Sequence, residues 1–315
     1  MVKRTVIFTL VFFLAGAALA ADKVRFAVHF KLNPHYVLPG LAALEKGYWK
    51  AQDLEVEYFP FDEGATMDRG VVAGNIDVGT QGLASMVVAA SAGVPEVMVA
   101  DPSIITEFYF WVRSDSPLRE PKDLKGAKIG VTRFGIASHN MARAVVKALG
   151  FDEKDVKFIA TGGGAPHVAA LKAGVIDISS LSDFAFAPLK FKGEVRELIR
   201  MENYLPKGVT AQVVFARRDF LDRNPAVVKK LVKGFLRGAE FVMKNPEWSM
   251  EKMKAEFRYT PELARGVLPW LKYDISGRIE EANIKNVVEF LLEYGLVARE
   301  KVPSLDRLYR KGFTE

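Results

Sequence analysis

The sequence predicts an α/β protein with two lobes, each built on a mixed, mostly parallel sheet. Short apolar strands alternate with amphipathic helices from residue 24 to residue 200, a pattern typical of parallel sheets. The segment Ala73–Val78 (AGNIDV) recurs about 100 residues later as Ala173–Ile178 (AGVIDI), which indicates two similar β-α-β-α-β units. A crossover and a returning strand between the units predict two lobes with a cleft.

The first unit is predicted from apolar runs of period two and helical stripes of period 3.6. Its expected strands are residues 24–30, 54–59, 76–80, 96–100 and 107–113. Its expected helices are residues 36–50, 64–73 and 82–92. Gly47 lies near the end of the first helix and Gly74 follows the second, where a left-handed residue commonly ends a helix.

A polar segment, Ser114–Lys125, contains Pro117 and Pro121 and is predicted to cross into the second unit. The expected strands of this unit are residues 128–132, 156–160, 175–180 and 195–200. The expected helices are residues 137–149, 165–173 and 184–190. Pro166 stands in the first turn of the second of these helices, where proline is favoured.

After the second unit the chain is predicted to return and then to become helical. The β-branched run Val209–Ala216 indicates the return strand. Asn224-Pro225 is a cap with a first-turn proline, and Asn245-Pro246 ends the helix that begins there. The apolar stripe of this helix consists of Val228, Leu231, Phe235, Ala239 and Val242. Three shorter helices are expected to follow.

Residues 1–20 are expected to be a secretory signal peptide, cleaved near Ala20. Lys3 and Arg4 precede the apolar run Val6–Leu19, and Ala18-Leu19-Ala20 is a small-x-small cleavage site. The alternative is an uncleaved membrane anchor, but the run is shorter than the roughly 20 apolar residues of a spanning helix. The mature protein is therefore expected to be soluble and, without a lipid anchor, to lie in a periplasm.

The composition excludes several classes of protein. The 315 residues include no cysteine, which excludes disulfides, thiol catalysis, cysteine metal sites and a lipoprotein anchor. Lys and Arg number 44 against 38 Asp and Glu, a net charge of +6, and loss of Lys3 and Arg4 leaves +4. This mild bias favours acidic ligands. Nucleic acid is not expected as a partner, because no basic stripe with interleaved aromatic residues is present.

Ligands of open parallel sheets bind beyond the carboxyl ends of the strands, so the candidate site lies in the loops that follow them. These loops are residues 30–35, 80–83, 132–139, 161–167 and 181–184. Phe30 and Lys31 follow the first strand directly, where they can stack on a ligand and pair with its charge.

Two equivalent turns follow the echoed strands, one in each unit. Thr80 and Gln81 lie in the first turn, and Asp183 and Phe184 lie in the second. The polar groups of Gln81 and Asp183 are expected to point into the cleft. The alternative is that both side chains satisfy local backbone groups, as Asx-type side chains often do.

The turn Thr132–His139 follows the first strand of the second unit. A guanidinium can pair with a carboxylate or sulfonate, and polar side chains at the helix start can donate hydrogen bonds. The candidate contacts of this turn are Arg133, Phe134, Ala137, Ser138 and His139. The alternative places Arg133 in solvent at the rim, with Ser138 acting as a helix cap.

The glycine-rich loop Thr161–Pro166 opens a helix and includes the candidate contact Gly163. Its glycines allow close backbone approach, and free N–H groups at a helix start attract an anion. The alternative is a flexible turn that needs positive φ. The glycine spacing fits neither a phosphate P-loop nor a dinucleotide fingerprint.

The sequence gives no sign of a metal, a cofactor or a catalytic group. No metal-ligand spacing joins the four histidines, which are His29, His35, His139 and His167. No Gly-x-Ser-x-Gly elbow is present, and no nucleophile has an evident base. Asp77 and Asp177 stand just before their strands, so they are expected at the amino ends, in structural roles away from the cleft.

Six short segments, in a specific order and spacing, carry a resemblance to a known family. They are Leu41–Trp49, Ala73–Gly79, Val112–Pro117, Asp123–Gly130, Ala170–Gly174 and Phe220–Pro225. In this order they resemble the type II periplasmic solute-binding proteins of the NMT1/THI5-like, nitrate/sulfonate/taurine (SsuA/TauA-like) group, and the resemblance extends over essentially all of residues 22–315.

The resemblance implies two Rossmann-like lobes with hinge strands near 109–114 and 210–217 and a ligand between the lobes. Lobe 1 would comprise residues 21–112 and 213–315, with the C-terminal helices packed on it. Lobe 2 would comprise residues 113–212.

The resemblance also implies a monomeric binding component of an ABC importer, without enzyme activity or cofactor. Its partners would be a small-molecule ligand and the permease subunits in the inner membrane. In sulfonate binders the ligand turn is Gly-Ser-Ser-like, whereas here it reads Gly135–Ser138 (GIAS) and lacks two hydroxyls. An organic acid or a flat heterocycle is therefore expected as readily as a sulfonate.

Two rival functions stay open. One is a ligand sensor that presents its closed form to a membrane receptor. The other is an enzyme on the same fold. Pyrimidine-precursor synthases of this kind have a cysteine-rich motif that the chain lacks, and menaquinone-pathway enzymes are cytoplasmic.

Overall fold

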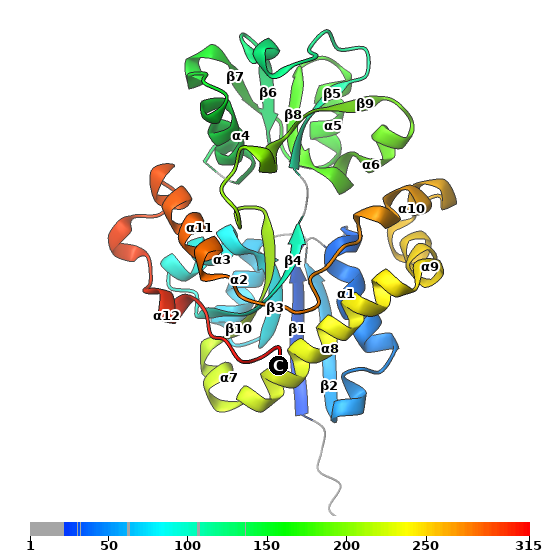
Figure 1. Cartoon of the computed structure of the whole chain (residues 1–315), viewed down its shortest axis with the longest axis vertical. Coiled ribbons are helices and arrows are strands. Elements are labelled where there is room, and N and C mark those ends of the chain that lie inside the picture. The colour runs from blue at the N-terminus through cyan, green and yellow to red at the C-terminus, as the bar shows by residue number, and fades with distance from the viewer. Residues whose placement is uncertain (1–21, 30, 32, 62–63, 106–107, 136) are drawn as a thin grey trace, which may run out of the picture.

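The computed structural model describes residues 22–29, 31, 33–61, 64–105, 108–135 and 137–315. The predicted signal peptide, residues 1–20, and the candidate contact Phe30 lie outside this described part. Two five-stranded sheets, each flanked by helices, lie one above the other (Figure 1). The predicted α/β class with two mixed sheets is confirmed.

The sheet of the lower half in Figure 1 has the strand order β2-β1-β3-β10-β4. Its strands are β1 (Asp22–His29), β2 (Leu54–Phe61), β3 (Val78–Gly82), β4 (Glu96–Ile105) and β10 (Ala211–Arg217). β1 pairs in parallel with β2 and β3, whereas β10 runs antiparallel to β3 and β4.

The sheet of the upper half repeats this arrangement as β7-β6-β8-β5-β9. Its strands are β5 (Phe108–Arg113), β6 (Lys128–Val131), β7 (Lys157–Ala160), β8 (Ile178–Ser182) and β9 (Val195–Arg200). β6 is parallel to β7 and β8, and β5 is antiparallel to β8 and β9. The two sheets share one topology, as the internal repeat predicts.

The antiparallel strand of each sheet is the one that arrives from the other half of the molecule. β5 follows β4 along the chain but pairs in the upper sheet, from Phe108 opposite Ser182 onward. β10 returns to the lower sheet, where Gln212 already lies opposite Gly82. Strand pairing therefore changes sheet before Phe108 and before Ala211, a few residues earlier than the predicted lobe boundaries at 112/113 and 212/213. β5 and β10 are each hydrogen-bonded to a neighbouring strand on both edges. Each therefore belongs to one sheet over its whole length, and the chain changes sheet before the strand begins.

The helices of the two units flank these sheets. They are α1 (Pro34–Glu45), α2 (Gly64–Val72), α3 (Leu83–Ser91), α4 (Ala137–Ala148), α5 (Ala165–Lys172) and α6 (Asp183–Phe191). Single 3₁₀ turns lie at η1 (Lys50–Gln52), η2 (Pro121–Leu124), η3 (Glu153–Asp155), η4 (Met201–Asn203), η5 (Leu268–Trp270) and η6 (Arg299–Lys301).

The first helix begins and ends earlier than the predicted range 36–50. It begins at Pro34 because the Asn33 side chain accepts the N–H of His35 at 2.9 Å, an N-cap followed by a first-turn proline. It ends at Glu45, and Gly47 takes a φ of 68° directly after it. The shift places His35 inside the first helical turn.

The C-terminal part is helical, as predicted, but the number of helices differs. After α7 (Arg218–Arg223) and α8 (Pro225–Lys244) come α9 (Pro246–Phe257), α10 (Pro261–Val267), α11 (Glu281–Glu293) and α12 (Leu305–Leu308). Four α-helices thus follow α8 rather than three, since the four residues of α12 are too few to show a period. No helix of the described residues is long and apolar enough to cross a membrane.

Helix α8 packs closely on α1 in the lower half. Gly238 makes this possible, because a Cβ there would lie 2.0 Å from the carbonyl oxygen of Pro39. Phe235 of α8 stacks on Phe26 of β1 with ring centroids 5.5 Å apart, and the predicted apolar stripe of α8 is buried. The C-terminal helices therefore pack on the first half, as the resemblance implies.

Candidate functional site

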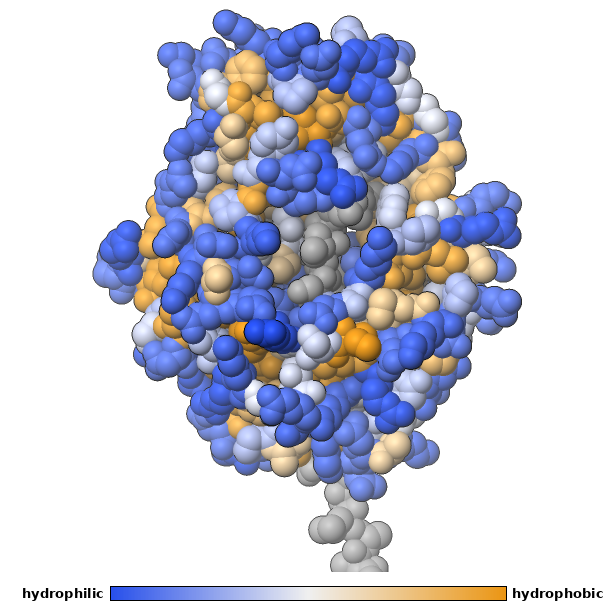
Figure 2. All heavy atoms as spheres, viewed as in Figure 1, coloured by the Kyte–Doolittle hydropathy of each residue, from blue (hydrophilic) through white to orange (hydrophobic). Residues whose placement is uncertain are grey.

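The carboxyl ends of the two sheets face each other, and one aromatic contact joins them. Phe184 comes directly after β8 of the upper sheet, and His35 lies in the helix that follows β1 of the lower sheet. Their rings are 5.8 Å apart. Figure 2 shows the surface hollowed at this level, between the two halves. The fold thus brings the predicted loops of both halves to one place.

His35 is a deeply enclosed polar residue at this junction, with 1% of its surface exposed. Its Nε2 lies 2.9 Å from the carbonyl oxygen of Lys272, and the Tyr273 hydroxyl donates to the His35 carbonyl at 3.0 Å. Its Nδ1 has no hydrogen-bond partner among the described residues. Burial lowers the pKa of His35 to about 4, so the ring is neutral at pH 7.

Thr80 and Gln81 end β3, and their side chains separate to the two faces of the sheet, as successive residues of a strand do. Thr80 accepts a hydrogen bond from Gln212 Nε2 at 3.1 Å, whereas Gln212 Oε1 is buried and has no partner in the described ranges. Gln81 donates instead to Glu96, inside the lower half. The amide of Gln81 is therefore committed to the protein interior.

Glu96, which accepts the hydrogen bond from Gln81, lies close to a second carboxyl group, that of the half-buried Asp68 in α2. Burial raises the pKa of Glu96 well above its ordinary value, and the charge of the nearby Asp68 raises this pKa further. The hydrogen bond from Gln81 lowers the pKa, but by less. Burial also raises the pKa of Asp68 to about 6. One oxygen of each carboxyl, Glu96 Oε1 and Asp68 Oδ1, has no hydrogen-bond partner.

In the upper half, the turn between β6 and α4 is closed by its own polar groups. Ser138 Oγ accepts the N–H of Thr132 at 3.1 Å and lies 2.8 Å from the Thr132 hydroxyl. His139 Nδ1 accepts the N–H of Gly135 at 3.0 Å, and its ring packs edge-on against Phe134. Ser138 is the second residue of α4 and bonds to Thr132 before the helix, so its hydroxyl closes the turn rather than capping the helix, and His139 also acts within the turn.

Arg133 and Phe134 project from the same turn into solvent. Arg133 is exposed and makes no hydrogen bond or ion pair within the described residues, and Phe134 is 60% exposed. Lys31 is also exposed, after β1, and its N–H donates to the carbonyl of Phe61 at 2.9 Å. The turns after the first strands of both sheets thus each carry an exposed cation.

The remaining candidate contacts are placed less completely. Gly163 is exposed, and a Cβ there would only reach ordinary contact with Thr132, so space alone does not require glycine. Ala137 and Asp183 are the first residues of α4 and α6, and their side chains lie outside the described part. His167 is buried and bonded through both ring nitrogens, to Ser179 and Thr161 among others.

The two halves also touch on both flanks of the site. On one flank, Phe184 and Phe191 of α6 pack against Trp270, at centroid distances of 5.4 and 6.0 Å. On the other flank, Lys147 of α4 pairs with Glu293 of α11. One flank is therefore apolar and aromatic, and the other is charged.

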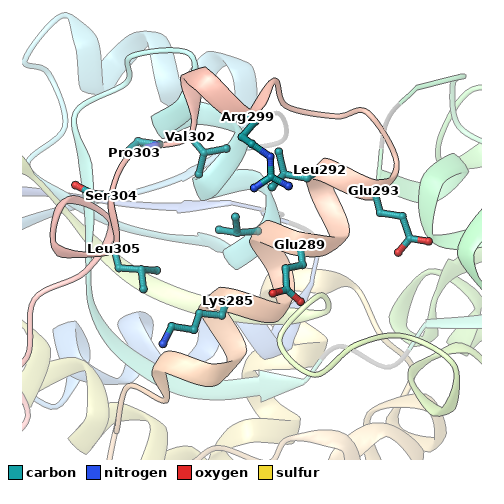
Figure 3. A pocket seen from close by; sticks show the side chains of 10 residues that line it. Lys285, Glu289, Leu292, Glu293, Arg299, Val302, Pro303, Ser304 and Leu305 are labelled. Atoms are coloured by element: carbon teal, nitrogen blue, oxygen red, sulfur yellow. The ribbon is translucent and has the colours of Figure 1, made fainter.

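The described pockets lie elsewhere. A pocket of about 630 Å³ lies between α11 and the segment that follows it, with Glu289 and Arg299 on its walls (Figure 3). A second, of about 340 Å³, lies near Pro95 and Arg217, at the amino end of β4. Neither includes a candidate contact, and no group of three metal-ligating side chains occurs within the described residues.

Sequence reasoning missed His35, Gln212 and Tyr273 at the junction. The Asn33-Pro34 pair, which repeats the cap signal used for α8, would have placed His35 in a helical first turn facing the cleft. Gln212 is a buried amide at the start of an otherwise apolar strand. No local signal identifies Tyr273, because it reaches the site through packing of a distant segment.

Comparison with known proteins places this geometry in a family. The chain is 27% identical over 241 residues to the taurine-binding periplasmic protein of Escherichia coli, covering 76% of this chain and 73% of that protein. It is 22% identical over 258 residues to the 4-amino-5-hydroxymethyl-2-methylpyrimidine phosphate synthase THI11 of Saccharomyces cerevisiae, covering 78% and 73%. Its relatives thus include binding proteins and, at lower identity, enzymes.

The fold matches that of the periplasmic aliphatic sulphonate binding protein SsuA from Escherichia coli. The TM-score is 0.77 at 19% identity, and the match covers 91% of this chain and 97% of that one. The sequence model described as "NMT1/THI5 like" matches residues 35–249, more than half of the chain. The protein therefore belongs to the NMT1/THI5-like family, as its sequence segments suggested.

Proposed function

We propose that this protein is the substrate-binding component of an ABC importer and holds a small organic anion or heterocycle between its halves. The observation that carries the proposal is the contact between His35 and Phe184, which brings the carboxyl ends of two matched sheets together. Ligands of open α/β sheets bind at this end. Membership of the NMT1/THI5-like family and a taurine-binding periplasmic relative support the proposal.

The mechanism is a shift between open and closed forms. A ligand binds to one half, and contacts from the other half stabilise closure. The halves act as two lobes: one contains the β1–β4 and β10 sheet with the C-terminal helices, and the other contains the β5–β9 sheet. β5 and β10 are the strands at which the chain passes between them, which suits them to act as hinges.

The proposal includes the location and the partners of the protein. Residues 1–20 direct export and are removed near Ala20, so that the mature chain acts in the periplasm as a monomer. The permease subunits then recognise the closed form through both lobes. Periplasmic binding proteins among the relatives support this location.

Two exposed cations are proposed to hold the anionic part of the ligand. Lys31 and Arg133 follow the first strands of their sheets, one in each half. Arg133 is the better candidate because its guanidinium can form two parallel hydrogen bonds with a carboxylate or sulfonate. Phe30, Phe134, Ala137, Gly163 and Asp183 stay candidate contacts in the surrounding loops.

Binding without turnover is part of the proposal. The yeast relative is a synthase, but the present chain lacks the cysteines of the motif expected in such synthases. A receptor-coupled sensor would use the same closed form, so a pull-down with permease or receptor separates these two partners. Recovery of a chemically altered ligand would contradict the binding role.

A thermal-shift screen of the mature protein tests the proposal directly. The panel comprises organic acids, sulfonates, nitrate, amino acids and pyrimidines. A ligand at 100 times its Kd stabilises the folded state by about 2.7 kcal/mol, which gives a measurable rise in melting temperature. Absence of a shift with every class of compound would overturn the proposed function.

A further inference from the structure

We propose that His35 Nδ1 is a hydrogen-bond acceptor for the ligand, so that the protein selects a molecule bearing an N–H or O–H donor. This inference rests on the proposed function, because it concerns the same site between the two halves. None of the sequence candidates assigns a contact to His35. Three observations support the inference. They are the tautomer of the His35 ring, the lack of a described protein partner for Nδ1, and the position of the ring in the fold.

The tautomer follows from the bond on the far side of the ring. His35 Nε2 lies 2.9 Å from the carbonyl oxygen of Lys272, and a carbonyl can only accept. Nε2 therefore carries the proton. Because the buried ring is neutral, Nδ1 is left as an unprotonated nitrogen with a lone pair, which can only accept.

Within the part of the chain that the structure describes, no donor completes this acceptor. Asn33 Oδ1 is occupied by the backbone N–H of His35, and the Tyr273 hydroxyl donates to the His35 carbonyl. The other neighbours at the ring are aromatic faces and edges, including Phe184 at 5.8 Å. A buried acceptor without a partner is rare and destabilising, and a ligand donor would remove this penalty.

The position of the ring points to the ligand as the missing donor. His35 lies in the first turn after β1, at the carboxyl end of the lower sheet, and touches the first turn after β8 of the upper sheet. A second buried acceptor without a partner, Gln212 Oε1, lies at the same end of the lower sheet. The lower half thus offers acceptors, while the upper half offers the exposed cation of Arg133.

This arrangement fits a ligand with a donor at one end and an acidic or electron-rich group at the other. Amino and hydroxy derivatives of small acids, or an amino-substituted heterocycle, have this chemistry. A plain anion without N–H or O–H would leave His35 Nδ1 buried and unsatisfied in the closed form. The predicted discrimination is therefore against the ligand that lacks the donor.

The test uses three matched pairs of probes that differ in one donor. They are isethionate and ethanesulfonate, 3-hydroxypropionate and propionate, and 4-aminopyrimidine and 4-methylpyrimidine, so that the two members of a pair carry the same net charge. Isothermal titration calorimetry of the wild-type protein is expected to show at least tenfold tighter binding of the donor-bearing member in the pair that binds. Equal affinity within the binding pair overturns the inference but leaves the proposed function intact. Binding of none of these probes also counts against the inference, whereas the proposed function is overturned only if the wider thermal-shift panel gives no shift.

Two variants separate the ligand contact from the structural contact. His35→Gln places an amide where Nε2 lies, so it keeps the bond to Lys272 and removes the Nδ1 acceptor. His35→Asn places its oxygen where Nδ1 lies and loses the bond to Lys272. The donor preference is expected to vanish in H35Q and to persist in H35N, whose melting temperature falls instead. A preference that survives in H35Q overturns the inference.

Nitrogen NMR of the wild-type protein gives a readout that needs no variant. With ¹⁵N-labelled histidine, the His35 ring of the unliganded protein is expected to be neutral, with the proton on Nε2 and an unbonded Nδ1. Addition of the donor-bearing probe is expected to shift the Nδ1 resonance towards a hydrogen-bonded value, whereas the matched probe does not. A proton on Nδ1 in the unliganded protein would contradict the assignment.

Discussion

Asp77 and Asp177 make the same backbone contact in the two halves of the molecule. Asp77 Oδ2 accepts the N–H of Arg25 at 3.0 Å, and Asp177 Oδ2 accepts the N–H of Lys128 at 2.8 Å. Each aspartate also donates its own N–H to the carbonyl of the same partner, at 3.0 and 2.9 Å. Both thus anchor the start of the third strand of a unit to the first. They lie at the amino ends, as the sequence predicts.

The environments of the two aspartates differ, and this predicts unequal effects on stability. Asp77 is buried and pairs with Arg25 and Arg217, whereas the side chain of Asp177 is 37% exposed beside Lys128. Asp77→Asn removes the buried carboxylate that pairs with both Arg25 and Arg217 and leaves Arg217 only the half-exposed Asp219. It is expected to cost about 3 kcal/mol of unfolding free energy. Asp177→Asn is expected to cost less than about 1 kcal/mol.

Urea denaturation of both variants at pH 7 measures this difference. Equal destabilisation would contradict the argument from burial. Hydrogen bonds from Arg25 and Arg217 outweigh burial and hold the pKa of Asp77 below its usual value. Its contribution is therefore present above the unfolded-state pKa near 3.8 and is lost as the pH falls towards the folded-state value.

Glu96 predicts the opposite pH dependence. Burial raises its pKa, so the folded protein keeps the proton while the unfolded chain releases it above about pH 4.5. Stability is therefore expected to fall as the pH rises from this value. Glu96→Gln keeps a polar partner for Gln81, but its amide does not ionise. The variant is therefore expected to be more stable than wild type at pH 8. Melting curves at pH 5 and 8 check this, with the exposed Glu55→Gln as control. An unchanged slope would contradict it.

His35 predicts a loss of stability in acid. Its pKa is about 4 in the folded protein against 6.5 for the free side chain, so only the unfolded chain takes up the proton between these values. As the pH falls from 6.5 towards 4, protonation of His35 in the unfolded chain is expected to lower the free energy of unfolding by about 3 kcal/mol. Glutamine does not titrate, so the difference in unfolding free energy between wild type and His35→Gln is expected to change between pH 6.5 and pH 4. A constant difference would rule it out.

The aromatic flank predicts a variant that opposes closure. Gly266 of α10 faces Phe191 of α6, and a Cβ at Gly266 would lie 2.2 Å from the Phe191 ring. Gly266→Val is expected to hold the halves apart and to weaken ligand binding roughly tenfold, or about 1.4 kcal/mol. A larger radius of gyration by X-ray scattering would accompany it.

The compensating variant is Phe191→Ala on the Gly266→Val background. Removing the ring makes room for the valine, so the double variant is expected to recover both compactness and affinity. Failure of the second change to restore either quantity would show that Gly266→Val acts on α10 itself rather than on closure.

Arg133 predicts a loss of affinity without a loss of stability. The side chain is exposed and has no partner among the described residues, so its removal leaves nothing unsatisfied. Arg133→Ala is expected to weaken an anionic ligand at least tenfold, about 1.4 kcal/mol, with an unchanged melting temperature of the free protein. Lys125→Ala, an exposed cation at the crossover, is the matched control. Unchanged affinity in calorimetry would remove Arg133 from the site.

Much of the fold could be predicted because its signals are local. The AGNIDV and AGVIDI segments mark equivalent strands, and the order of strands and helices follows from hydrophobic periods within each segment. The stripe of α8 is one helix face, so the residues expected inward are the ones buried. The four residues of α12 carry no period, and their helix could not be predicted in this way.

The sequence by itself determined the class of fold, the repeated unit and the loops that surround the site, because these depend on residues near one another in the chain. Only the tertiary structure decided which side chains in those loops are free. It turned Gln81 towards Glu96, closed the Ser138 hydroxyl into its own turn and enclosed His35 between Phe184 and Tyr273. Hydrogen bonding and burial depend on partners far away in the chain, which no local pattern specifies.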